Sequence, residues 1–95
     1  MTAKKAYLII DIGTGNVRVA ITDQSATILH LERGNVNYVK DELYPDALYF
    51  EPGELWNQVL DLAQKALQQV PGVDIVAITA SSQREGIVLL ELVLV

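Results

Sequence analysis

The chain has 95 residues, 51% hydrophobic and 20% charged, which is the composition of one small folded domain and excludes a disordered chain. The net charge of -5 argues against a surface that binds nucleic acid, and the absence of cysteine excludes disulfides, thiolate nucleophiles and cysteine-based metal sites. The first apolar run is short and contains an acid, so we expect neither a signal peptide nor a membrane span, and a soluble, cytoplasmic protein.

Three β-strands are predicted in the first third of the chain. Residues 7–12 are apolar and rich in β-formers, and residues 17–22 alternate between two faces. The four residues between them, 13–16, are turn formers that tolerate positive φ, so the two strands form a hairpin. A second turn at 23–26 leads to a strand at 27–33, which completes a three-stranded antiparallel meander. One face of the second strand consists of Val17, Val19 and Ile21.

One helix is predicted after an irregular stretch. Residues 34–51 show no clear period, which indicates a functional or poorly ordered loop. Pro52 suits the first turn of a helix, Glu54 lies near the positive end of its dipole, and Pro71-Gly72 ends it. The apolar stripe recurs at three- and four-residue steps and consists of Leu55, Val59, Leu62, Ala63, Ala66 and Leu67.

Two further strands complete the expected fold. Residues 73–80 have the composition of a strand buried on both faces, and residues 86–90 form the next strand. The order β-β-β-α-β implies an α/β fold with a mixed sheet, in which the helix is the crossover that brings the fourth strand parallel to a neighbour.

The turn at 13–16 is a candidate anion site. A dinucleotide fingerprint needs a third glycine and a following helix, whereas here Arg18 and a strand follow, and no Walker sequence is present. A hairpin tip of this kind offers backbone N–H groups, a hydroxyl, an amide and a guanidinium to phosphate oxygens. The candidate phosphate ligands are Gly13, Thr14, Gly15, Asn16 and Arg18, and Asp11 is the candidate oxygen ligand for hydrated Mg²⁺.

Three segments resemble one enzyme family. Residues 11–18 resemble the Asp-x-Gly-Thr-x-x-x-Arg phosphate motif of the FGGY carbohydrate kinases, within the wider actin, Hsp70 and ribonuclease-H-like group. Residues 78–86 are similar to the segment after the fourth strand of these kinases, where glycerol kinase carries Gln-Arg-Glu and autoinducer-2 kinases carry a similar Ser-x-Arg-Glu-Gly-Ile-Val. Residues 51–56 resemble an Asp-Pro-x-x-Trp sequence at the first helix, with Glu51 in place of Asp.

The resemblance implies a fold and a site. It implies a partial ribonuclease-H-like (actin-like ATPase) fold, with residues 1–95 as the N-terminal part of the first kinase domain. ATP and Mg²⁺ are the implied cofactors, and a sugar or polyol is the implied substrate. Asp11 would help to hold the Mg²⁺, and Thr14 and Arg18 would lie near the transferring phosphate. The residues implied to bind substrate hydroxyls are Gln83, Arg84 and Glu85.

The chain also departs from the family. Its members are several times longer, with a second domain and a general base further along, so we expect this polypeptide alone not to phosphorylate a sugar. We expect apolar surface to be exposed and the chain to self-associate, since residues 88–95 are β-rich with one charge. The alternative functions are a non-catalytic binding or oligomerising module, and another actin-like ATPase, which would not be expected to carry residues 83–86.

Each candidate residue has a structural alternative. Asp11 could be a strand-end acid that bonds to turn amides, and Arg84 with Glu85 could form a solvated ion pair. Trp56 is expected to anchor the helix in the core, and His30 to lie on the surface or on a sheet face. For the tyrosines of the long loop, packing is at least as well supported as sugar stacking; they are Tyr38, Tyr44 and Tyr49.

Overall fold

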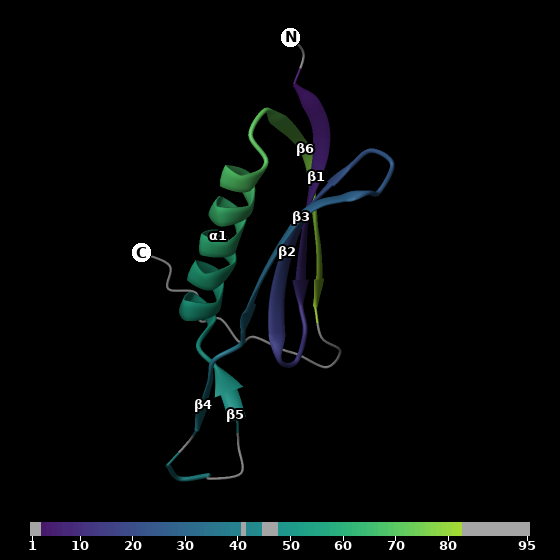
Figure 1. Cartoon of the computed structure of the whole chain (residues 1–95). Coiled ribbons are helices and arrows are strands. Elements are labelled where there is room, and N and C mark those ends of the chain that lie inside the picture. Colours follow the sequence, from purple (N-terminus) through teal and green to yellow (C-terminus); the bar gives the residue numbers. More distant parts are fainter. Residues whose placement is uncertain (1–2, 41, 45–47, 83–95) are drawn as a thin grey trace, which may run out of the picture.

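The computed structural model describes residues 3–40, 42–44 and 48–82, in which one α-helix packs on a sheet (Figure 1). In chain order the elements are β1 (Lys4–Ile12), β2 (Asn16–Asp23), β3 (Ile28–Asn35), β4 (Tyr38–Lys40), β5 (Leu48–Phe50), α1 (Pro52–Gln69) and β6 (Val73–Ser82). The β1–β2 turn, the end of β6 and the short β4–β5 hairpin all lie at the same end of the molecule.

The four long strands form a mixed sheet in the order β3-β2-β1-β6. β1 is antiparallel to β2, and β2 is antiparallel to β3, so the predicted meander is confirmed. β6 is parallel to β1, and α1 lies in the crossover connection that a parallel pair requires. The expected α/β fold class with a mixed sheet is therefore correct, while the strand predicted at 86–90 lies outside the described residues.

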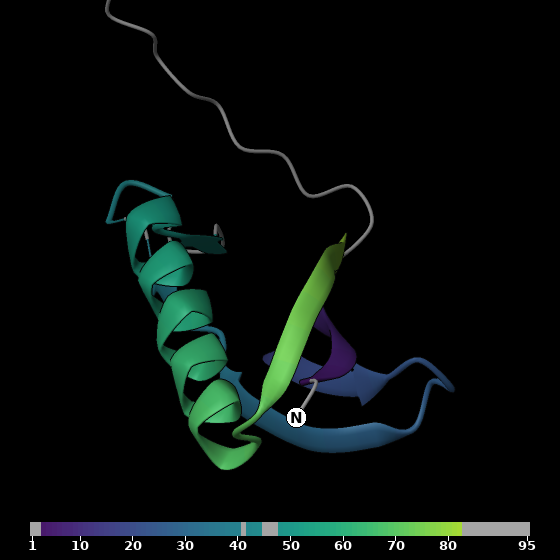
Figure 2. The same cartoon turned by 90° about the horizontal axis from the view of Figure 1, so that it is seen from above.

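The hydrophobic core lies between α1 and the sheet. Figure 2 shows α1 on one side of the strands, and the helix buries Val59, Leu62 and Ala66. It packs mainly on β2 and β3. Successive side chains of a strand point to opposite faces, so the alternating residues of β2 face the helix. The fully buried side chains of the sheet are Ala6, Val17, Val19 and Ile21.

Helix α1 begins and ends at residues suited to those positions. The Glu51 carboxylate accepts a hydrogen bond of 2.7 Å from the N–H of Glu54, and Pro52, which has no N–H, occupies the first turn. Gly72, with a φ of 81°, reverses the chain toward β6, a backbone conformation that favours glycine. No helix in the described part of the chain is long and apolar enough to cross a membrane.

The stretch at 34–51 is more regular than expected. β3 continues to Asn35, and β4 pairs with β5 through Tyr38 opposite Phe50 and Val39 opposite Tyr49. The expectation of an irregular loop was wrong for these residues, because aromatic and β-branched side chains favour cross-strand pairing even in three-residue strands.

β6 is much more exposed than its composition predicted. Val73 and Ile75 are half-buried, but Ile78 is 65% exposed, so the prediction of burial on both faces is wrong. The cause is position: among the described strands β6 pairs only with β1, at one edge of the sheet, and α1 packs on β2 and β3 instead.

Trp56 also departs from expectation. Its side chain is 59% exposed, so it does not anchor α1 in the core. At 3.6 residues per turn it lies roughly 100° around the helix from Leu55, on the flank of the buried stripe. His30 lies half-buried on β3, as expected of a sheet-face histidine, with Nε2 2.9 Å from Oε1 of Glu32.

The β2–β3 turn is organised by one carboxylate. Asp23 accepts hydrogen bonds from the N–H groups of Ser25 and Thr27, at 2.9 and 3.0 Å, and lies 3.7 Å from the Lys4 ammonium. The Thr27 amide above all, with the Ser25 amide and the Lys4 charge, lowers the pKa of this carboxyl below its ordinary value of 3.8, while partial desolvation opposes the shift.

Two leucines on α1 test the position of the core. Leu62 is buried, whereas Leu60, on the same helix, is 43% exposed. We expect Leu62→Ala to lower the free energy of unfolding by about 2–5 kcal/mol because it leaves a cavity. Leu60→Ala is the matched control, with an expected loss below about 1 kcal/mol. Urea unfolding of the two variants measures both, and equal losses would contradict this packing.

The Asp23 turn predicts a pH dependence. Because folding lowers the pKa of Asp23, the unfolded chain binds the proton more tightly there than the folded chain does. The stabilisation is therefore complete above the ordinary pKa and is lost as the pH falls through the lower folded-state value. We expect the stability difference between the wild type and Asp23→Asn to shrink between about pH 5 and pH 3 in urea unfolding. A constant difference, or one that matches that of the helix-surface variant Asp61→Asn, would contradict the assignment.

Candidate functional site

The candidate site is the hairpin turn between β1 and β2. The Gly13 N–H donates a 2.8 Å hydrogen bond to the Asn16 carbonyl and closes the turn. Neither glycine of the turn has a positive φ; among the described glycines only Gly72 does. A Cβ on Gly13 would lie 3.4 Å from the Asn16 oxygen, whereas a Cβ on Gly15 would meet no atom within 4 Å. The turn is thus tight at Gly13 and open at Gly15.

Asp11 lies between two polar neighbours from different strands. The β1 register places it opposite Arg18 on β2 and opposite Ser81 on β6. Its two carboxylate oxygens are 3.4 Å from Arg18 Nη1 and 2.9 Å from Ser81 Oγ, and the serine hydroxyl donates. Asp11 and Arg18, both predicted site residues, are therefore brought together. The structural alternative, in which Asp11 bonds to turn amides, does not occur, because its partners are side chains.

Ser81, Asp11 and Arg18 lie side by side across three strands as a charged row, and this row continues onto β3. Arg33 on β3 lies opposite Arg18 and on the same face of the sheet, which is the face away from α1. Among the described residues Arg33 has no ion-pair partner, and the Asp11 carboxylate pairs with Arg18. Like charges on directly opposed strand residues are unfavourable. The site therefore has an excess of positive charge in a chain whose net charge is negative.

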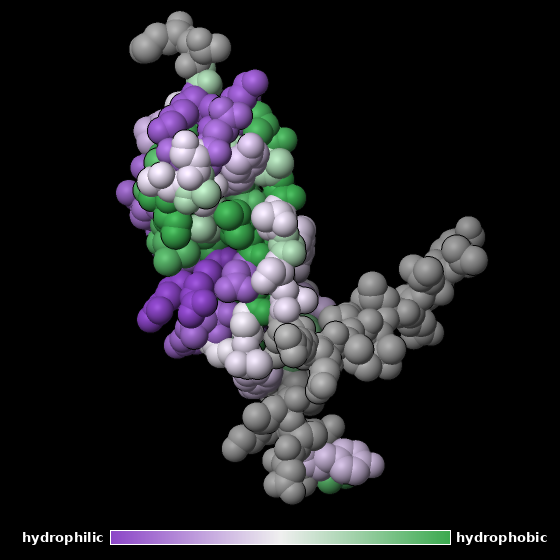
Figure 3. All heavy atoms as spheres, turned by 90° about the vertical axis from the view of Figure 1, so that its right-hand side faces the viewer, coloured by the Kyte–Doolittle hydropathy of each residue, from purple (hydrophilic) through white to green (hydrophobic). Residues whose placement is uncertain are grey.

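An apolar row lies next to the charged one. Two residues away along each strand, before Asp11 and Arg33 and after Arg18, lie the register neighbours Ile9, Leu31 and Ala20. Figure 3, which faces the right-hand side of Figure 1, shows hydrophobic side chains gathered in the middle of this surface, with hydrophilic ones above and below. The site thus borders an uncovered apolar part of the sheet.

Residues 36–38 support the turn from outside its own hairpin. The Val36 N–H donates a 3.0 Å hydrogen bond to the Gly15 carbonyl, and the Tyr38 hydroxyl donates to the Thr14 carbonyl. Sequence reasoning missed these contacts. It also missed Ser81, although the parallel pairing of the fourth strand, had its register been known, would have placed this residue beside Asp11. For Tyr38 the sequence suggested packing or sugar stacking, and no signal pointed to its contact with the turn.

The donor set of the site fits a magnesium ion held mostly by its nucleotide. Mg²⁺ commonly keeps several waters and binds through one or two carboxylates together with substrate phosphates. The described residues contain no group of three or more His, Asp or Glu side chains able to hold a metal by themselves. Asp11 supplies a single carboxylate, whose side chain is 41% exposed. Such a group suits an outer-sphere ligand, which contacts the waters bound to the ion.

The predicted substrate residues Gln83, Arg84 and Glu85 lie outside the described residues. Ser82, which precedes them in the chain, pairs with Ile12 at the end of β1. Their role in substrate binding stays a prediction.

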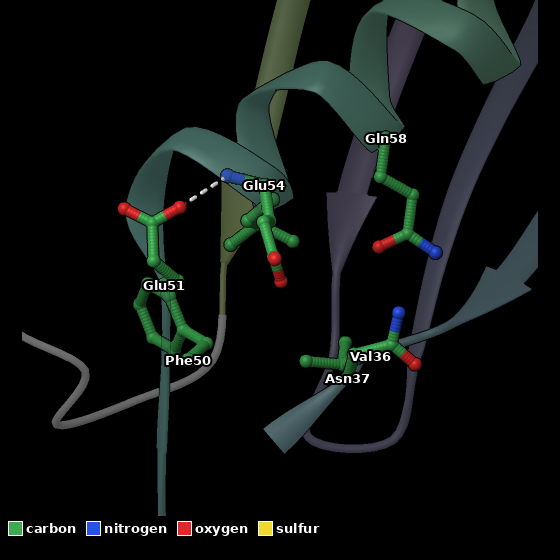
Figure 4. Close-up of a pocket in the computed structure, with 7 residues that line it drawn as sticks. Val36, Asn37, Phe50, Glu51, Glu54 and Gln58 are labelled. Atoms are coloured by element: carbon green, nitrogen blue, oxygen red, sulfur yellow. Dashed lines mark hydrogen bonds between the residues drawn. The ribbon is translucent and has the colours of Figure 1, made fainter. Parts of the chain in front are cut away.

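A separate pocket of about 120 Å³ lies where the β4–β5 hairpin meets the start of α1 (Figure 4). In this view Gln58 and Asn37 point toward each other, and the Glu54 N–H bonds to the Glu51 carboxylate. None of the predicted site residues lines this pocket. Its lining consists of Val36, Asn37, Phe50, Glu51, Glu54, Leu55 and Gln58.

Comparison with known proteins gives the family. The family model described as the N-terminal domain of the FGGY family of carbohydrate kinases matches residues 6–92. The chain belongs to the FGGY carbohydrate kinases. It is 46% identical over 91 residues to YoaC of Bacillus subtilis, which is named as a sugar kinase. The match covers 96% of this chain. The chain is 29% identical over 82 residues to the autoinducer-2 kinase of Salmonella paratyphi A, covering 84%.

The solved structures support the fold of this FGGY chain. The crystal structure of gluconate kinase from Lactobacillus acidophilus superposes with a TM-score of 0.74 at 18% identity, covering 85% of this chain and 16% of that one. The expected partial actin-like fold is therefore confirmed. The chain spans 19% of the length of the Bacillus relative and 16% of that of the Salmonella relative.

Stability measurements can separate this site from the fold. Asp11 and Arg18 have side chains 41% and 44% exposed, and exposed ion pairs contribute between about 0 and 1 kcal/mol. We therefore expect Asp11→Ala to change the free energy of unfolding by no more than about 1 kcal/mol in urea unfolding. A loss as large as that of Leu62→Ala would show that Asp11 is required for the fold.

Proposed function

We propose that this FGGY chain is the N-terminal part of the first domain of a kinase that transfers the γ-phosphoryl group of ATP to a hydroxyl of a sugar, polyol or related small molecule. The observation that carries the proposal is the exposed Asp11 carboxylate, held between Arg18 and Ser81 beside an open glycine turn. An acid beside a guanidinium at a turn combines a ligand for a hydrated cation with a donor for phosphate oxygens.

In this proposal the turn binds the phosphates. The backbone N–H groups of Thr14 and Gly15 donate to no described residue, so they are available to a ligand. Together with the Asn16 side-chain amide and the Arg18 guanidinium they would hold phosphate oxygens, as backbone nests and arginine forks do. Gly13 would contribute by closing the turn, because its N–H already donates to the Asn16 carbonyl. Asp11 would orient the hydrated Mg²⁺, which neutralises the phosphate charge when it is bound.

The acceptor is proposed to bind next to the end of β6. Arg84 offers donors and Glu85 offers an acceptor, and with Gln83 they would orient neighbouring hydroxyls of the substrate. A site that needs both donor and acceptor partners discriminates against analogues that lack a hydroxyl. The similarity to the autoinducer-2 kinase supports autoinducer-2 or a related small molecule as the acceptor.

We propose no general base within these 95 residues. Phosphoryl transfer depends mainly on positioning and charge stabilisation, and the groups described supply one side of that arrangement. The base and the adenosine contacts are proposed to come from outside this sequence, so the 95-residue chain by itself would be inactive.

The chain taken alone is also proposed to self-associate. Ile78 on β6 and Leu31 on β3 are exposed, and β6 has no second strand partner among the described residues. Sedimentation at micromolar concentration tests this, and a clean monomer would exclude it.

The kinase activity is testable on the product of the complete open reading frame that contains this sequence. We expect Mg²⁺-dependent ADP release with at least one member of a panel of glycerol, gluconate and linear polyhydroxy ketones. Asp11→Ala should lower turnover at least about 100-fold, the scale expected for loss of a preorganised charged group.

Asp61→Ala, at an exposed ion pair on α1, is the control and should keep full activity. Turnover of Asp11→Ala equal to that of this control would exclude the proposed role of Asp11. A product that releases no ADP with any acceptor, and whose 95-residue part shows no thermal shift with Mg·ATP, would favour a non-catalytic binding module instead.

A further inference from the structure

The turn at 13–16 is held by a segment that lies far from it in the sequence. The Tyr38 hydroxyl donates to the Thr14 carbonyl across 24 residues, and the Val36 N–H donates to the next carbonyl, that of Gly15. Two consecutive carbonyls of the turn are therefore fixed by residues that flank the start of β4.

Fixing a carbonyl also fixes the N–H of the same peptide. The Thr14 carbonyl and the Gly15 N–H belong to one peptide group, and the described chain contains no cis peptide bond. In a trans peptide these two groups point in opposite directions. The bond from Tyr38 therefore turns the Gly15 N–H away from the tyrosine hydroxyl, and this N–H has no acceptor among the described residues.

The tyrosine is itself placed by paired and packed elements. Tyr38 begins β4 and lies opposite Phe50 on β5. Phe50 packs against the core, and Glu51, which follows it, caps α1. The hydroxyl is thus carried by a hairpin anchored to both the core and the helix, so its position relative to the turn is set by the fold.

We propose that Tyr38 is a positioning residue for phosphate binding, which acts by orienting the Thr14–Gly15 peptide of the 13–16 turn and with it the Gly15 N–H. The inference rests on the proposed function, since it requires Thr14 and Gly15 to meet a phosphate. Tyr38 is 38% exposed, so water competes for its hydrogen bond and the expected effect is moderate. We expect Tyr38→Phe, which keeps the ring and the β4–β5 pairing, to weaken polyphosphate binding roughly three- to tenfold.

The test uses NMR of the 95-residue chain with Mg²⁺ and inorganic tripolyphosphate. The changes in the amide chemical shifts of Thr14 and Gly15 give the dissociation constant of tripolyphosphate. Amide hydrogen exchange without ligand reports the stability of the hydrogen bonds in the turn. Tyr38→Phe should speed exchange at Gly13, whose N–H bonds to the Asn16 carbonyl within the turn, while leaving exchange at the buried Val19 unchanged. A merely structural role would move both positions together.

Tyr7→Phe is the matched control, because the Tyr7 hydroxyl has no partner among the described residues. It should bind tripolyphosphate as the wild type does. Equal affinity for Tyr38→Phe and Tyr7→Phe would overturn the inference and leave the proposed function standing. If the wild type shows no shift at Thr14 or Gly15 with tripolyphosphate, the phosphate role of the turn is overturned, and the inference with it.

Discussion

The rest of the structure depends on the pairing of β1 with a strand on each side, each in a fixed register. β1 pairs with an antiparallel strand on one side and a parallel strand on the other, and both pairings place polar residues opposite Asp11. Strand alternation then gives β1 and β2 two different faces. One face packs under α1 through residues such as Val19, and the other presents the acid, its guanidinium and its serine. A shift of one residue would bury the charges and expose the core.

The parts of the fold that sequence predicted are those determined by local patterns. The alternation in β2 and the apolar stripe of α1 show which face of each segment can be buried, and Pro-Gly marks where the helix ends. All three signals depend only on residues close together in the sequence. The errors fall where burial depends on neighbours. The apolar composition of β6 shows that it can be covered on both faces, but only the sheet order shows that α1 packs elsewhere. Trp56 is a similar case, because aromatic character does not determine which side of a helix faces the core.

For the site, sequence predicted the residues of one hairpin and missed those that long-range pairing adds. Asp11 and Arg18 are close in the chain, and a two-strand hairpin is enough to bring them together. Ser81 reaches Asp11 only through the parallel register, and Tyr38 reaches Thr14 only because β4 and β5 pair. The turn itself was predicted correctly, although its glycines adopt no positive φ and the sequence did not show the open space at Gly15.

On the sheet face away from α1, the strength of the Asp11–Arg18 ion pair depends on what covers the neighbouring apolar row. In water an ion pair with side chains as exposed as those of Asp11 and Arg18 is weak, because solvent screens it. The apolar row that contains Ile9 and Leu31 lies two residues away on the same face. Any layer that packs on this apolar row brings low-dielectric material to the edge of the Asp11 site and strengthens the electrostatic interaction between Asp11 and Arg18. A covered apolar row would therefore exclude water from the charged row, which suits the phosphate role proposed for Asp11 and Arg18.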